Sequence, residues 1–306
     1  TPDSIVVDGP TNSVTINWPN ITNTTPQILA VDLTVTVVDS PFADNLSLSN
    51  LLQVATENSG AVTATAVRPV LILIRSPELV ITKGVLSADQ GNINPLPTVL
   101  PVDGNITGVD ANDSITYQIT VENTGGASAF DVLIEDPAVP GLTNCVIDSV
   151  TDGTGAGLVF TGDLVAGISL TNPLAANDEN PVDGGAPFTD DTALINVSCE
   201  IVPDALFNTV ITNTASVTYA SIAGGPSFPV EEDTADTVTA SPTVNKTILQ
   251  VLPNVDGVDN TVTIGETIQY QVLVTLPEGQ GNNAQIVDLL DNGLVFDSFD
   301  GFFILH

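Results

Sequence analysis

The residues best suited to chemistry in this chain are two lysines among only four basic residues. Lys83 and Lys246 occupy the same place in two similar stretches, each at the start of an apolar run. A lysine that points into an apolar core needs an acidic partner or a lowered pKa. Asp136 and Asp288 follow the two lysines at matching positions. We therefore expect each lysine to meet one of these carboxylates.

Two asparagines supply a third reactive group. Asn213 opens the stretch Asn-Thr-Ala-Ser-Val-Thr-Tyr, and Asn58 opens the similar stretch Asn-Ser-Gly-Ala-Val-Thr-Ala. Lysine, asparagine and an acid are the ingredients of an intramolecular isopeptide bond. A neutral amine attacks the amide carbon, a protonated carboxyl polarises the amide, and ammonia leaves. The simpler alternative is a plain Lys–Asp ion pair at a strand end, with Asn213 in a turn.

Strands must position these groups. Residues 113–125 alternate apolar and polar side chains, with Tyr117 on the apolar face, which predicts a strand with one buried face. The pattern returns at residues 266–274, where Tyr270 takes the same place. A chain that repeats itself is read first as an array. We expect both tyrosines to be core residues with a satisfied hydroxyl.

The fold class predicted is all-β. Val, Ile, Thr, Gly, Pro, Asn and Asp dominate, no helical apolar stripe is present, and short strands recur at about ten-residue spacing, which favours β-sandwiches. Beyond the repeated stretches, the expected strands are a pair within residues 4–18, a strong strand at 28–38, a pair within 51–66, and a strand at 286–288.

The predicted repeat boundaries do not coincide with the two ends of the chain. Residues 76–242 form a complete repeat, residues 1–75 match its C-terminal half, and residues 243–306 match its N-terminal half. Neither half can bury its apolar face alone. Either the chain is one period of a longer array, or separate copies complete each other head to tail, with residues 1–75 of one copy filling residues 243–306 of another. A third reading is that flanking sequence of another kind completes each half.

The pattern resembles a large family of Ig-like conserved repeats in bacterial and archaeal surface proteins, long labelled a domain of unknown function. The residues that carry the resemblance are Lys83, Asp113, Tyr117, Asn123, Gly125, Asp136, Gly141, Leu142 and Asn213, and then Lys246, Glu266, Tyr270, Asp288, Gly293 and Leu294. The third segment departs from it at Leu276-Pro-Glu-Gly, where the Asn-Thr-Gly turn is missing. The resemblance implies tandem Ig-like sandwiches in adhesins, stalks, sheaths or surface layers, and no enzyme activity.

By analogy with related surface-protein sandwiches, the crosslink would join Lys83 to Asn213 with Asp136 as the acid. In the split domain it would join Lys246 to Asn58 with Asp288. Cys145 and Cys199 are the only cysteines and fall in one repeat. Members of the family often carry such a pair, so a disulfide is expected, with two free buried thiols as the alternative.

Two loops rich in Asp and Asn precede the same strand in both repeats. Their oxygens, at one- to three-residue spacing, suit Ca²⁺, although neither loop has EF-hand spacing. The candidate ligands for a structural calcium ion are Asp103, Asp110, Asn112, Asp256 and Asp259. The alternative is a pair of solvated turns, since Asp-Gly pairs form turns in any case.

Charge restricts the partners. The 37 acidic residues against four basic ones give a net charge of −33, which argues against nucleic acid and against anionic lipid surfaces. No signal peptide or membrane-spanning run is visible. The two cysteines and seven glycosylation sequons fit an extracellular or cell-surface location. The sequon asparagines are Asn20, Asn23, Asn45, Asn105, Asn112, Asn196 and Asn245.

The function predicted is structural: copies joined head to tail in a filament, stalk, sheath or surface layer. The alternative is an adhesin whose loops recognise glycan or protein. The sequence shows no Ser-His-Asp set, no histidine-based metal cluster and no phosphate loop, so we expect no enzyme. An adhesin tip usually has one divergent domain, and none is seen here. Particle shape separates the two readings.

Overall fold

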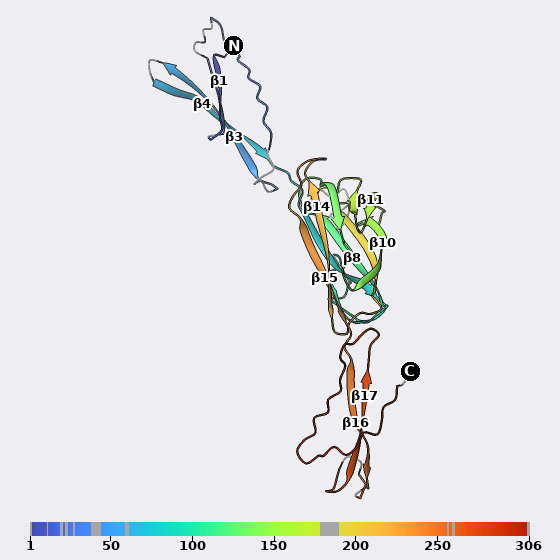
Figure 1. Ribbon diagram of the computed structural model, residues 1–306. Coiled ribbons are helices and arrows are strands. Elements are labelled where there is room, and N and C mark those ends of the chain that lie inside the picture. Colours follow the sequence, from blue (N-terminus) through green and yellow to red (C-terminus); the bar gives the residue numbers. More distant parts are fainter. Residues whose placement is uncertain are drawn as a thin grey trace. The chain divides into compact units, whose positions relative to one another are not determined.

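The computed structural model describes residues 2–10, 12–18, 21, 24–26, 28–37, 44–58, 61–177, 190–255, 257–258 and 261–304, with side chains left out at 55–58 and 61–67. All regular structure in these ranges is β, which confirms the all-β class (Figure 1). Within the same ranges no helix could span a membrane. The chain divides into two compact units, Thr1–Ser40 and Pro41–His306.

The middle repeat contains a four-stranded antiparallel sheet in the order β10-β13-β8-β5. Its strands are β5 (Leu79–Ala88), β8 (Ser114–Asn123), β10 (Leu142–Asp152) and β13 (Thr192–Ile201). The central strand β8 is the alternating stretch that the sequence predicts as half-buried. Ile115, Tyr117, Ile119 and Val121 are all fully buried.

A seven-stranded sheet in the order β11-β12-β9-β14-β15-β7-β6 forms the second layer. Its strands are β6 (Asn92–Asn94), β7 (Asn105–Val109), β9 (Phe130–Glu135), β11 (Phe160–Asp163), β12 (Gly167–Leu170), β14 (Val210–Ala220) and β15 (Glu231–Thr239). All its strand pairs are antiparallel except β15 with β7.

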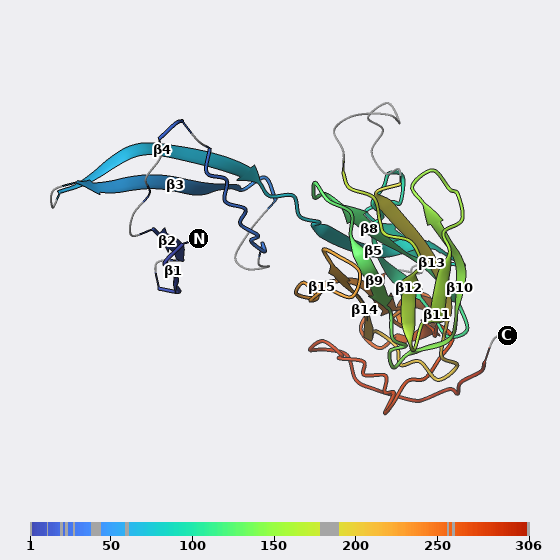
Figure 2. The same cartoon turned by 90° about the horizontal axis from the view of Figure 1, so that it is seen from above.

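One apolar core contains inward residues of both sheets. Figure 2 shows the strands of the two sheets from above. The inward residues of β8 and β13 meet those of β9 and β14, among them Ile134 and Val217. Tyr117 donates or accepts a 2.7 Å hydrogen bond with the Thr237 hydroxyl across this core, so its phenol is satisfied as expected. The middle repeat therefore buries its apolar faces without help from the rest of the chain.

The Asn-Thr-Gly turn that follows β8 is a packed junction. Buried Asn123 donates through Nδ2 to the carbonyl oxygens of Ala127 (2.8 Å) and Ala175 (2.6 Å). Its Oδ1 accepts from the backbone N–H groups of Gly125 (3.1 Å) and Glu78 (3.2 Å). A side chain at Gly125 would run into the backbone of residues 76–78. Asparagine and glycine are thus required here by hydrogen bonding and by space.

The third segment begins as a copy of the second. Strands β16 (Thr243–Leu252) and β17 (Thr267–Thr275) form a two-stranded antiparallel sheet. Lys246 lies opposite Val272, as Lys83 lies opposite Ile119 in the pair β5–β8. Both pairs also carry a register shift at the same point, between residues 248 and 250 and between residues 85 and 87. The repeat seen in the sequence is therefore a repeat of strand register and bulge.

The turn that departs from the family pattern contacts the middle repeat. The carbonyl oxygen of Glu278 accepts from the Ala111 N–H (3.2 Å), and the Gln280 N–H donates to the Ala205 carbonyl (2.8 Å). A side chain at Gly279, whose φ is +126°, would meet the Ala205 carbonyl oxygen. Residues 278–280 thus hold the turn after β17 against two loops of the middle repeat.

The N-terminal segment confirms two predicted strand pairs. Strands β1 (Ser4–Asp8) and β2 (Ser13–Asn17) pair in the first unit, and β3 (Ser47–Asn58) pairs with β4 (Ala61–Leu73) in the second. The correspondence of Asn58 with Asn213 fails locally. Asn58 ends β3 and pairs with Ala61 across a hairpin, whereas Asn213 lies within the continuous strand β14.

The expected strands at 28–38 and 286–288 are wrong for the chain by itself. Residues 28–37 and 286–290 belong to no strand, and residue 38 lies outside the described ranges. Their apolar side chains are exposed; Ile28 is 98% and Leu289 is 89% accessible. A strand is completed by a neighbour's hydrogen bonds, and neither segment has a paired neighbour among the described residues.

Candidate functional site

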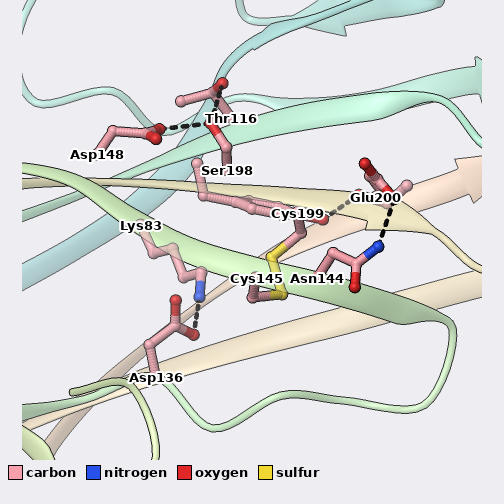
Figure 3. The surroundings of a disulfide bond; sticks show 11 residues. Lys83, Thr116, Asp136, Asn144, Cys145, Asp148, Ser198, Cys199 and Glu200 are labelled. Atoms are coloured by element: carbon pink, nitrogen blue, oxygen red, sulfur yellow. Dashed lines mark hydrogen bonds and ion pairs between the residues drawn. A yellow bond between two sulfur atoms is a disulfide. The ribbon is translucent and has the colours of Figure 1, made fainter.

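Lys83 and Asp136 form a buried ion pair within the middle sandwich, as the sequence predicts (Figure 3). Lys83 lies on β5 and Asp136 directly follows β9, so the pair joins the two sheets. The lysine side chain is 0% and the aspartate side chain 2% accessible. The ammonium also lies 5.3 Å from the Tyr117 ring centroid, within cation–π range.

Burial changes the protonation chemistry of this pair. Desolvation lowers the pKa of Lys83 from its usual 10.5, against the attraction of Asp136. Desolvation likewise raises the pKa of Asp136 from its usual 3.8, against the attraction of Lys83. Both shifts favour a neutral amine beside a protonated carboxyl. Those are the two protonation states that amide attack by lysine requires.

Asn213 lies on the buried face of the second sheet, the face that points toward the core containing the Lys83–Asp136 pair. On β14 the buried residues alternate through Asn213, Ala215 and Val217. Ala215 pairs with Asp233, whose carboxylate accepts the Lys83 backbone N–H (2.6 Å). Asn213 therefore lies two residues, or roughly 7 Å along β14, from Ala215, whose cross-strand partner Asp233 binds the Lys83 backbone. Its amide oxygen Oδ1 is buried and has no hydrogen-bond partner among the described residues.

The second lysine site is a half-built copy of the first. Lys246 Nζ bonds both carboxylate oxygens of Asp288, at 2.8 and 2.7 Å, and lies 4.1 Å from the Tyr270 ring centroid. The lysine and aspartate side chains remain 34% and 42% accessible. Asn58, the expected amide, has no described side chain. The second site therefore has its lysine, acid and tyrosine, and lacks the cover that buries the first.

The two cysteines are joined. Cys145 on β10 and Cys199 on β13 form a disulfide across neighbouring strands, with an S–S distance of 2.08 Å (Figure 3). Beside it, Asn144 donates from Nδ2 to Glu200 (2.7 Å). The bond joins positions 54 apart in the sequence within the middle repeat, as the family resemblance implies, and excludes the alternative of two free thiols.

The acidic loops are brought together only in part. Asp110, Asn112 and Asp113 line an open pocket with Asp89, Gln90 and Glu278, whereas Asp103 is exposed elsewhere and does not line it. Gln90 Nε2 donates to Asp110 (2.5 Å) and Asp113 (2.6 Å). In the described part of the chain no group of three or more His, Cys, Asp or Glu is arranged to hold a metal ion. Calcium binding stays a prediction, and Asp256 and Asp259 lie outside the described residues.

The sequon asparagines differ in accessibility. Asn45, Asn105, Asn112 and Asn245 are exposed, Asn196 is half-buried, and Asn20 and Asn23 lie outside the described residues. The amide of Asn196 is also engaged, since its Oδ1 accepts from Gln118 (3.0 Å). Among the described sequons, Asn196 is thus the least suited to carry a glycan.

Sequence reasoning missed two participants. Asp233 binds the Lys83 backbone, yet in the sequence it stands in an acidic run, Glu231-Glu-Asp233, that reads as solvated surface. Glu278 lines the acidic pocket from the third segment. For Glu278 the sequence did contain a signal, because residues 276–279 depart from the family pattern. A turn that differs between two repeats is expected to make contacts that the other repeat does not make.

Comparisons with known proteins place this chain in no family. No protein-family model matches it, and no curated protein matches it. Among solved structures, the major pilin subunit BcpA of Bacillus cereus is 10% identical, with a TM-score of 0.35 over 74% of this chain and 64% of the pilin. A variant of that pilin is 12% identical, with a TM-score of 0.34. The chain thus spans less than two thirds of the pilin's length.

Two other solved structures are also similar to the chain. One, described as BspA_C_WT, is 15% identical, with a TM-score of 0.28 over 62% of this chain and 60% of that one. The other is a family 123 glycoside hydrolase from Clostridium perfringens, 9% identical, with a TM-score of 0.27 over 53% of this chain and 27% of the hydrolase. At such TM-scores none of these likenesses carries a functional argument.

Proposed function

We propose that the chain is a non-enzymatic structural protein of the cell surface, whose copies join head to tail by completing a split β-sandwich. The product is a filament, stalk, sheath or surface layer of tandem Ig-like repeats. The observation that carries the proposal is the half-built site around Lys246. It repeats the strand register, bulge, ion pair and tyrosine of the buried site, and it is open to solvent.

Exposed apolar surface supports the same proposal. Val272 on β17 is 37% accessible, whereas its counterpart Ile119 is fully buried. The phenylalanines at 296, 299, 302 and 303 are all more than two thirds exposed. Large apolar side chains exposed in such number along one segment are typical of a surface that a partner covers. Residues 1–75 of another copy carry the C-terminal half of the repeat, which is the half that this surface lacks.

A covalent bond would reinforce each repeat. In the middle sandwich, Lys83 Nζ attacks Cγ of Asn213 as a neutral amine while protonated Asp136 donates to Oδ1. As the carbonyl re-forms, the Oδ1 proton returns to Asp136, one proton of Nζ passes to Nδ2, and the Cγ–Nδ2 bond breaks so that ammonia leaves. Supporting this are the opposite pKa shifts of the pair and the unpartnered, buried Oδ1 of Asn213. At a completed junction, Lys246 and Asp288 would need an amide from the next copy, and Asn58 does not hold the strand position that Asn213 holds in β14.

Intact-mass analysis of the reduced, denatured chain tests the crosslink. We expect the native protein to weigh one ammonia less than its sequence for the bond in the middle repeat. Asp136→Asn and Lys83→Arg should each restore the full mass, whereas Lys246→Arg should leave the monomer mass deficit unchanged. A full-mass native protein would leave Lys83 and Asp136 as an ion pair only.

Electron microscopy of the purified chain tests assembly. We expect uniform filaments or sheets whose repeat matches one chain. Isolated particles that bind a glycan array would instead support the adhesin alternative, and isolated particles that bind nothing would contradict both functions.

A further inference from the structure

The geometry points to strand addition at one edge. We propose that residues 29–37 of a second copy pair antiparallel with the free edge of β17, in the register that sets Leu33 opposite Tyr270. This inference rests on the proposed head-to-tail function and specifies its contact.

The edge is vacant in a defined way. In the complete sandwich β8 has a neighbour on each side, β5 and β13. Its counterpart β17 pairs only with β16, the counterpart of β5, in the described part of the chain. The vacant edge of β17 is therefore the place that β13 holds beside β8. An open edge with unpaired N–H and C=O groups is a template for another strand.

The register can be carried over because the two strand pairs match. Lys83 opposite Ile119 corresponds to Lys246 opposite Val272, and the bulge follows at the same distance in both. In the complete sandwich Val197 lies opposite Tyr117, and Ile195 lies opposite Ile119. A strand in the vacant place should therefore set apolar residues opposite Tyr270 and Val272.

Residues 29–37 match β13 position by position. The run Leu-Ala-Val-Asp-Leu-Thr-Val-Thr-Val aligns with Ala193-Leu-Ile-Asn-Val-Ser-Cys-Glu-Ile201, with apolar residues at every inward place. Val31 then corresponds to Ile195, and Leu33 to Val197. Both Val31 and Leu33 are exposed, and residues 28–37 make no strand within the described residues. This segment is extended, apolar on one face and without a sheet.

The outward face gives an independent check. In the complete sandwich Gln118 donates to Asn196 (3.0 Å), and Thr116 and Ser198 share a 3.0 Å hydrogen bond. The same register sets Gln271 opposite Asp32 and Gln269 opposite Thr34. The amide of Gln271 would meet a carboxylate, which strengthens the hydrogen bond. Gln269 Nε2 donates to Asp300 (2.9 Å) within the single chain and would exchange that partner for Thr34.

Paired cysteines in the full-length chain test the register. Asp32→Cys with Gln271→Cys places two thiols directly opposite each other, within reach of a disulfide. Asp32→Cys with Thr275→Cys is the matched control, since Thr275 faces the same way but lies four residues along β17, too far to bridge. After mild oxidation we expect the first pair to give a ladder of covalent multimers that disappears on reduction, and the control to give no multimers that reduction removes.

The possible failures are distinguishable. The register is overturned if the control pair gives a ladder, or if neither pair gives one while filaments still form. In both cases the proposed function still stands. A disulfide that closes within single chains would overturn the role of a second copy at this edge. If the parent chain forms no assembly at all, the proposed function fails with it. Peptide mapping of the Cys145–Cys199 bond checks that the native disulfide is unaltered.

Discussion

At the residue scale, burial distinguishes the two lysine sites. Lys83 and Lys246 have the same kinds of neighbours, an aspartate and a tyrosine. The first pair is out of water and the second is open to it. A buried pair that loses one partner leaves an uncompensated charge, whereas an exposed pair contributes little. The Lys83–Asp136 pair and the Lys246–Asp288 pair should therefore contribute unequally to the free energy of unfolding, although they contain the same residue types.

Removing each acid tests this difference. We expect Asp136→Ala to lower the free energy of unfolding by about 3–5 kcal/mol, because the Lys83 amine is left buried alone. The matched variant Asp288→Ala should change it by no more than about 1 kcal/mol. Urea titrations of both variants in an Asn213→Ala background, where no crosslink can form, measure the two effects. Equal losses of unfolding free energy in the two variants would contradict the assignment of Lys83–Asp136 as the buried pair and Lys246–Asp288 as the exposed one.

The shifted pKa values predict a pH dependence. Because the pKa of Asp136 is raised in the folded protein, its contribution to the free energy of unfolding is complete below pH 3.8. This contribution is lost as pH rises through the pKa of the folded state. The lowered pKa of Lys83 makes its contribution full above pH 10.5 and lost as pH falls through the folded value. Against an apolar Lys83→Met/Asp136→Leu variant in the same Asn213→Ala background, the parent should be weakest at intermediate pH. A difference independent of pH would show that the pair does not titrate on folding.

At the scale of elements, the turn after β8 fixes where the middle sandwich begins. Asn123 and Gly125 connect this turn to the backbone of residues 76–78, which directly precede β5. The corresponding turn of the third segment has a different sequence and contacts the middle repeat instead. Turn chemistry thus distinguishes a closed repeat from one that continues into a neighbour.

Gly125→Ala tests the space at this turn. The added methyl would meet backbone atoms of residues 76–78, and overpacking of this kind costs about 1–3 kcal/mol. Gly157→Ala is the control, since nothing lies within 4 Å of a Cβ there. Thermal unfolding should show a lower melting temperature for the first variant and little change for the second.

At the scale of the whole molecule, charge opposes association. Every copy carries a net charge of −33, so two copies repel each other strongly at low salt. Salt screens this repulsion, since the Debye length falls from about 30 Å at 0.01 M to about 8 Å at 0.15 M. Assembly should therefore depend on the ions present as well as on the interface.

Light scattering against salt concentration tests the charge argument. We expect filament growth to be faster at 0.15 M than at 0.01 M sodium chloride. Calcium and magnesium chloride at equal ionic strength form the control. A larger effect of calcium would favour bound ions at the acidic loops, and growth that slows with salt would contradict repulsion as the barrier.

The sequence by itself determined the all-β class and the repeat, because both follow from local alternation and from spacing, which are written along the chain. The sequence also indicated a carboxylate near each lysine and, through the family resemblance, the disulfide, with free thiols as the alternative. It also predicted strands at 28–38 and 286–288 that the single chain does not form, because a strand needs a neighbour as well as a pattern. Only the tertiary structure decided which ion pair is buried, that Asp233 holds the Lys83 backbone, and that Asp103 stands apart from Asp110. Burial and sheet edges depend on which segments meet in space, and among the described residues no third strand pairs with β16 or β17.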